Sequence, residues 1–80
     1  MGVEIFALDI IDSNPIKPIE FGFYVDLEFK TIKIGGIIDI KNEDLKNRYI
    51  CRSKIEDKIY TYELVHDIGL NKWFIVDIKS

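Results

Sequence analysis

Apolar and polar residues alternate along most of the chain, and the alternation is clearest over residues 19–30. The odd-numbered positions of this segment are all apolar, and the even-numbered ones are polar except for a glycine and a tyrosine. Side chains of a strand point alternately to opposite faces, so this spacing predicts a β-strand with one buried and one solvated face. A strand of this length exceeds the usual five or six residues, and we expect a bend within it, with Gly22 as the candidate position.

Beyond this segment the apolar side chains move to even-numbered positions, from Ile32 to Ile40. A two-residue hairpin loop at Lys30-Thr31 explains the change, and so does a β-bulge at the same point. Lys-Thr suits a primed turn badly, because both loop residues of a type I′ turn need positive φ, so both interpretations are kept. Gly35-Gly36 predicts a second bend shortly afterwards.

The other segments also indicate short strands and turns. Residues 3–11 are β-rich with apolar residues on both faces, which favours a central strand. We further expect a turn or extended link over 14–18, a polar loop or one helical turn capped by Asn42 over 42–47, a hairpin of 48–54 and 58–66 around Glu56-Asp57, a loop over 67–71 and a closing strand over 72–78. The predicted fold is all-β, or β-rich with one short helical turn: about six antiparallel strands in a small sandwich or half-open barrel.

Length and composition then narrow the class of protein. Eighty residues with 48% hydrophobic content predict a single domain, residues 1–80, with one shared core. One cysteine forms no internal disulfide, which favours a reducing compartment. The N-terminus lacks a basic region, and no apolar run approaches the roughly 20 residues that cross a bilayer. We therefore expect a complete small cytoplasmic protein without membrane contact.

Residues for catalysis are scarce. His66 is the only histidine, so the His66-Asp67 pair has no further imidazole with which to build a metal site. Cys51 and His66 would make a nucleophile and base if neighbouring strands brought them together. The simpler interpretation is that Cys51 is a small buried hydrophobe and His66 ends a strand. We expect no enzymatic activity, no metal and no cofactor.

The charge of the chain is unevenly distributed. Residues 1–29 contain six carboxylates against Lys17 alone, whereas residues 46–58 contain five basic side chains against two acidic ones. Acidic sheet faces select and accelerate association with basic proteins, and tyrosine is enriched at interface hot spots. The expected partner-binding residues are Glu20, Tyr24, Asp26 and Glu28. The preferred function is a non-catalytic immunity protein of bacterial type, an antitoxin that occludes the active or substrate-binding site of a basic, nuclease-type toxin.

Three alternatives remain open. A phage-type inhibitor of a host defence complex needs the same surface properties. A small β-barrel that binds single-stranded nucleic acid would use Arg48, Arg52, Lys54 and Tyr60, although the formal charge of −3 opposes the approach of phosphates. A subunit of a larger assembly would pair an exposed strand edge with another chain.

Overall fold

A computed structural model describes residues 2–79 and has an all-β fold. Its strands are β1 (Val3–Ile11), β2 (Lys17–Val25), β3 (Glu28–Lys33), β4 (Gly36–Glu43), β5 (Lys46–Ile55), β6 (Lys58–Asp67) and β7 (Lys72–Lys79). The predicted fold class is confirmed, with seven strands where about six were expected. Over the described range there is no helix long and apolar enough to cross a membrane.

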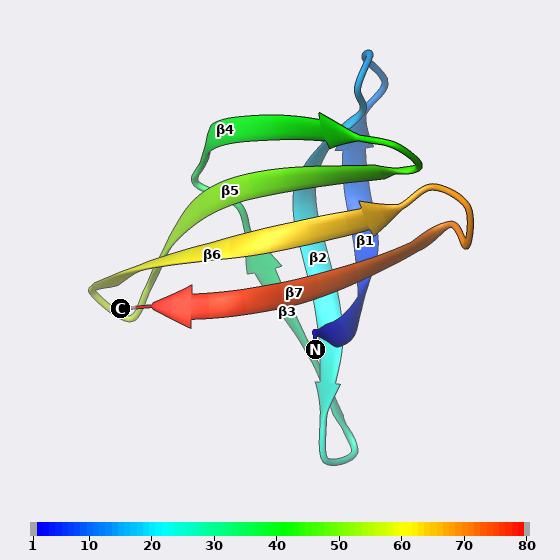
Figure 1. Cartoon of the computed structure of the whole chain (residues 1–80). Helices are drawn as coiled ribbons and strands as arrows, with labels where there is room; N and C mark the ends of the chain where they lie inside the picture. The colour runs from blue at the N-terminus through cyan, green and yellow to red at the C-terminus, as the bar shows by residue number, and fades with distance from the viewer. Residues whose placement is uncertain (1, 80) are drawn as a thin grey trace.

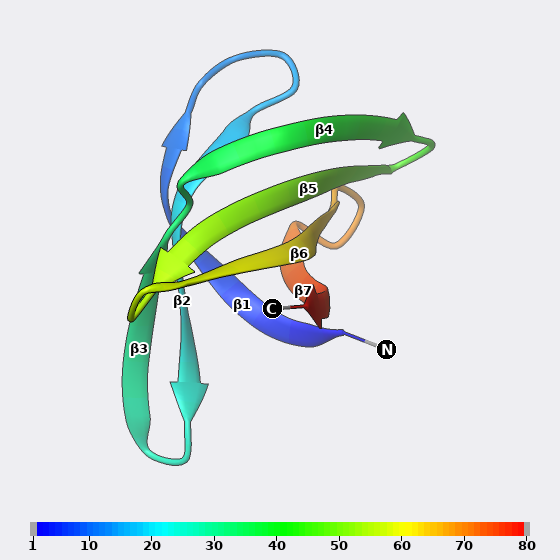
Figure 2. The same ribbon diagram turned by 90° about the vertical axis from the view of Figure 1, so that its left-hand side faces the viewer.

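The strands form one antiparallel sheet that curls into a half-open barrel. Their order is β3-β2-β1-β7-β6-β5-β4. The β1–β3 part of the sheet runs across the β4–β7 part, so that the two parts form facing layers (Figures 1 and 2). The first residues of β1, Val3–Ile5, pair with β7, and its later residues pair with β2. Register shifts beside Asp9 interrupt the β1–β2 ladder, and such bulges bend a strand. As predicted, β1 is a central strand.

The core lies between the two layers. It consists of Ile5, Phe21, Tyr49, Cys51, Tyr62, Leu64 and Trp73. Two buried hydroxyl groups connect the layers: Tyr49 donates to the carbonyl oxygen of Ile16, and Ser53 Oγ donates to that of Lys33 at 2.9 Å. Because the Ser53 proton is used in that bond, the Tyr62 hydroxyl donates to Ser53 Oγ. These bonds satisfy polar atoms inside the curl and fix how the layers face each other.

The sheet also closes on itself where β3 leads into β4. The amide of Ile34 donates to Ile19 O, and the amide of Gly35 donates to Arg52 O, both at 2.8 Å. The chain thus passes from the edge of one layer to the edge of the other within two residues. The bend predicted at Gly35-Gly36 is confirmed.

The single strand predicted over residues 19–30 is wrong, because the chain reverses at Asp26-Leu27. In the β2–β3 ladder Val25 lies opposite Glu28, which makes this a two-residue hairpin loop. Asp26 has a φ of 56°, a conformation that Asp tolerates better than most residues. Odd-numbered residues of β2 therefore share a face with even-numbered residues of β3. This reversal explains why the apolar residues move from odd-numbered to even-numbered positions by Ile32.

Two further local predictions are corrected and one is confirmed. Lys30 and Thr31 lie inside β3, so neither a hairpin loop nor a bulge occurs there. Asn42 lies opposite Asn47 in a tight β4–β5 hairpin instead of capping a helical turn. The hairpin around Glu56-Asp57 is present, and both residues have the positive φ of a type I′ turn, 49° and 67°.

Candidate protein-binding surface

The end of the β2–β3 hairpin projects beyond the other layer of the sheet (Figures 1 and 2). We call residues 24–29 the hairpin tip. Leu27, at its apex, is 97% exposed, and Val25, on the face that would otherwise point into the core, is also exposed. Apolar and polar residues still alternate in this part of the sequence, although no other strand covers the apolar side chains of Val25 and Leu27. The tip therefore presents apolar groups to solvent on both faces.

Three aromatic rings gather on the outer face of this hairpin. Tyr24 and Phe29 lie opposite each other in the β2–β3 ladder, with ring centroids 4.9 Å apart in an edge-to-face arrangement. Phe6, from β1, completes the group at 6.2 Å from Tyr24 and 6.4 Å from Phe29. The exposed fractions of Phe6, Tyr24 and Phe29 are 45%, 63% and 43%. This aromatic cluster holds its rings in fixed positions by mutual packing while leaving much of their surface open.

Carboxylates surround the aromatic cluster and the tip. Asp26 lies in the loop beside Tyr24, and Glu20 lies two positions before Gly22 on the same face. Glu20 faces Lys33 in one ladder and Asp9 in the other. Among the residues described, neither Glu20 nor Asp26 forms an ion pair, whereas Glu28 lies 3.4 Å from Lys30 Nζ. Most of the negative charge around the tip is thus available to a partner.

The structure brings together part of the predicted partner-binding set. Tyr24, Asp26 and Glu28 all belong to the hairpin tip, and Glu20 shares a face with Tyr24. They do not form the single exposed row that one long strand would give, because Glu28 lies opposite Val25 and therefore points to the other face.

Sequence reasoning missed the contributions of Phe6, Leu27 and Phe29 to this surface. The shift of apolar side chains from odd to even positions indicated a reversal, but it did not indicate that the loop was at Asp26-Leu27.

The predicted nucleic-acid set is divided between two faces. Arg48, Arg52 and Lys54 project from the same face of β5. Tyr60 lies opposite Ser53, on the core face. Arg48 donates to Glu43 at 2.9 Å and to Glu63 at 3.0 Å, and these hydrogen bonds raise the pKa of its guanidinium. Its charge is therefore already matched by two carboxylates.

Cys51 and His66 do not meet. Cys51 lies opposite Tyr62 and His66 lies opposite Asn47, so four β5 positions separate them. Cys51 is fully buried, as its simpler interpretation predicted, and burial raises the pKa of its thiol to about 12. Residues 2–79 contain no group of three or more His, Cys, Asp or Glu side chains arranged to hold a metal ion.

Comparison with known proteins gives no relative from which to infer function: no family model, no curated protein and no solved structure matches this chain.

Proposed function

We propose that this protein binds and inhibits a basic protein, as an immunity protein does when it neutralises a nuclease-type toxin, by placing the hairpin tip in the partner's substrate-binding site. The observation that carries the proposal is the aromatic cluster, which leaves Phe6, Tyr24 and Phe29 between 43% and 63% exposed beside unpaired carboxylates. Contiguous exposed apolar surface with a polar border is typical of protein interaction sites.

The shape of the tip suits occlusion. A projecting two-residue hairpin with Leu27 at its apex enters a concave site more readily than a flat sheet does. Asp26 and Glu20 supply negative charge where a nuclease carries positive charge for phosphates. Such complementarity raises the association rate, and the preformed packing of the three rings lowers the entropy lost on binding.

Single-stranded nucleic acid fits less well. The charge of Arg48 is matched by two glutamates, and Tyr60 lies on the face opposite Arg52 and Lys54. Stacking platforms need aromatic rings and cations on the same face. The exposed rings of the aromatic cluster are instead bordered by carboxylates.

Affinity capture from a lysate of the native host, followed by reconstitution with the purified partner, tests the proposal. The wild type is compared with Tyr24→Ala and Leu27→Ala, and Leu45→Ala serves as the matched control. Leu45 is also an exposed leucine in a two-residue hairpin loop, but it lies in the β4–β5 loop. We expect a basic partner whose activity falls stoichiometrically with added wild-type protein.

The two tip variants are expected to weaken binding about tenfold or more, as hot-spot truncations do, whereas Leu45→Ala binds like the wild type. Binding that tolerates both tip variants, or a partner whose activity is unaffected by the protein, would contradict the proposal. A steep gel shift of labelled single-stranded DNA at low salt would favour the nucleic-acid alternative instead.

A further inference from the structure

A groove opens where β1 separates from β7. The ladder between these strands covers only Val3–Ile5 and Trp73–Ile75, and from Phe6 onward β1 follows β2 into the other layer. The β6–β7 hairpin turns away on the opposite side, and a hollow of about 550 Å³ lies between them. This volume is within the range of roughly 300–1,000 Å³ that ligand sites occupy.

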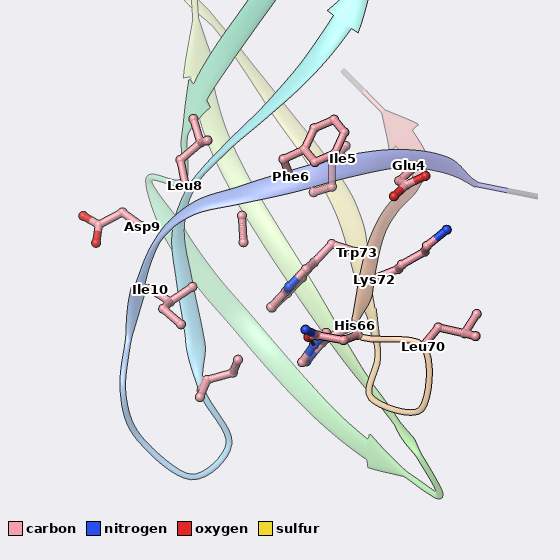
Figure 3. A pocket seen from close by; sticks show the side chains of 13 residues that line it. Glu4, Ile5, Phe6, Leu8, Asp9, Ile10, His66, Leu70, Lys72 and Trp73 are labelled. Atoms are coloured by element: carbon pink, nitrogen blue, oxygen red, sulfur yellow. Dashed lines mark hydrogen bonds between the residues drawn. The ribbon is translucent and has the colours of Figure 1, made fainter.

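The groove has an apolar floor, and its polar side chains include Glu4, Asp9 and Lys72. Trp73, His66 and Ile10 lie on the inner side of β1, whereas Phe6 and Leu8 project from its other side (Figure 3). Ile16 closes one end, and Leu70 and Asn71 close the other; these residues come from the β1–β2 and β6–β7 loops. Phe6 therefore belongs both to the edge of the groove and to the aromatic cluster.

His66 contains a buried polar atom without a partner. The residue is 7% exposed, and its ring stacks on Trp73 with centroids 4.2 Å apart and planes 8° apart. Nε2 lies 3.4 Å from Asn71 Oδ1, but Nδ1 has no hydrogen-bond partner within residues 2–79. Buried polar atoms are nearly always paired in folded proteins. The His66 ring thus lines the groove beside Trp73 with one nitrogen unpaired among the described residues.

The main chain of β1 indicates what kind of ligand the groove would bind. Beyond Ile5, the edge of β1 that faces β7 has no partner strand in the described ladders. An extended peptide placed there would continue the position that β7 occupies beside Val3–Ile5, with main-chain hydrogen bonds to β1. Its side chains would alternate between the groove, over Trp73, and the outer face, beside Phe6.

The charges at the rim favour a basic segment. Glu4 and Asp9 line the groove, with Lys72 as the opposing cation. None of the three takes part in an ion pair among residues 2–79. A lysine or arginine on the outward side of an added strand would meet this excess of carboxylate.

We propose that the groove binds an extended segment of the partner protein, in which apolar side chains alternate with lysine or arginine, as a strand added to β1. The inference rests on the proposed function for the basic character of the partner. It concerns a second site, however, separate from the hairpin tip.

Short linear peptides displayed on phage and selected against the folded protein test this inference. Trp73 and His66 are the only tryptophan and histidine in the chain, so Trp fluorescence and the imidazole NMR signals report on the groove without labels. We expect selected peptides that alternate apolar and basic residues, shift both signals saturably, and slow hydrogen exchange at Phe6–Leu8. Proline at alternate positions, which removes amide donors, should weaken binding about tenfold or more.

Matched variants separate the two sites. Ile10→Lys, in the groove, is expected to weaken peptide binding about tenfold by repulsion and lost apolar contact, whereas Ile59→Lys, an exposed control on β6 outside the groove, leaves it unchanged. Leu27→Ala, at the apex of the hairpin tip and outside the groove lining, should not affect peptide binding. A thermal melt of each variant identifies loss of folding.

Three results would overturn the inference: no enriched peptide, peptides that shift Tyr24 and Phe29 signals without Trp73 and His66, or affinity that survives the proline substitutions. If Tyr24→Ala abolishes capture of the natural partner while Ile10→Lys does not, the proposed function stands and the groove has no part in it. If Ile10→Lys alone abolishes capture, the groove is the binding site and the hairpin tip is not.

Discussion

Phe29 covers Gly22 on the outer face of the β2–β3 hairpin, and its ring occupies the space that a Cβ of residue 22 would need. Gly22 lies between Phe6 and Thr31 in neighbouring ladders, so the absence of its side chain creates a depression in the middle of the sheet face. The ring of Phe29 fills that depression and meets Tyr24 at its edge. The position of the Phe29 ring in the aromatic cluster therefore depends on the absence of a side chain at Gly22.

Gly22→Ala is expected to displace the Phe29 ring and to lower the free energy of unfolding by about 1–3 kcal/mol, as overpacking does. The control is Gly36→Ala, because a Cβ at Gly36 has no neighbour within 4 Å. Urea denaturation measures the stability of both variants, and the ring signals of Tyr24 and Phe29 report on the cluster. Unchanged ring signals in Gly22→Ala would show that the cluster does not depend on this contact.

Ser53→Ala is expected to destabilise the protein more than Tyr62→Phe does. The serine variant leaves the buried Tyr62 hydroxyl and the Lys33 carbonyl without Ser53, which costs about 1–3 kcal/mol, whereas the phenylalanine variant removes one hydroxyl of a satisfied pair, about 1 kcal/mol. The double variant should be more stable than additivity predicts, because no hydroxyl is then left unpaired. Chemical denaturation of the wild type, the two single variants and the double variant gives the four free energies of unfolding. If the two single losses simply add in the double variant, the Ser53 and Tyr62 hydroxyls do not interact as the structure shows.

The free energy of unfolding is expected to fall at alkaline pH through Cys51 and Tyr62. Burial raises the pKa of each to about 12, from ordinary values of 9.0 and 10.0. Between about pH 9 and 12 the unfolded chain has lost protons that the folded chain retains, so stability is complete below pH 9 and declines above it, by up to roughly 1.4 kcal/mol per pH unit per group. Urea denaturation between pH 8 and 10 measures the slope.

Cys51→Ala is the control for this slope. Between pH 9 and 10 the thiol of this pair ionises in the unfolded chain to a greater extent than the tyrosine hydroxyl, so the variant should show a flatter dependence there. A buried neutral thiol should also react with a thiol reagent only in urea. A fast reaction in native buffer, or equal slopes for variant and wild type, would contradict the burial of this group.

Much of the fold could be predicted from alternation and turn chemistry. The β-rich run of residues 3–11 predicts a strand whose bounds match β1, and the two β-rich segments on either side of Glu56-Asp57 predict the hairpin that β5 and β6 form. These predictions depend on local properties, which the sequence carries directly.

The hairpin at Asp26-Leu27 was missed because its signal is misleading. Leu27 and Phe29 continue the odd-numbered apolar series of β2, although one lies in the loop and the other on the outer face. Alternation assumes that a covering layer exists on one side, and at the tip no layer is present. The groove was missed for a related reason: the separation of β1 from β7 depends on tertiary pairing, which no local pattern indicates.

Substituting Asn-Gly at two sites tests whether the chain reverses at Asp26-Leu27 or at Lys30-Thr31, with the confirmed loop at Glu56-Asp57 as the reference. At Glu56-Asp57 both residues have positive φ, so Glu56→Asn with Asp57→Gly should relieve strain and raise the free energy of unfolding by about 1 kcal/mol. The same pair placed at residues 30 and 31 should lower it by about 1 kcal/mol or more, because glycine inside β3 weakens a strand and Asn-Gly favours a turn there. Chemical denaturation of the two double variants decides between the assignments. Stabilisation by Asn-Gly at residues 30 and 31 would mean that the chain reverses there, and the hairpin tip would then not exist in the form on which the proposed function depends.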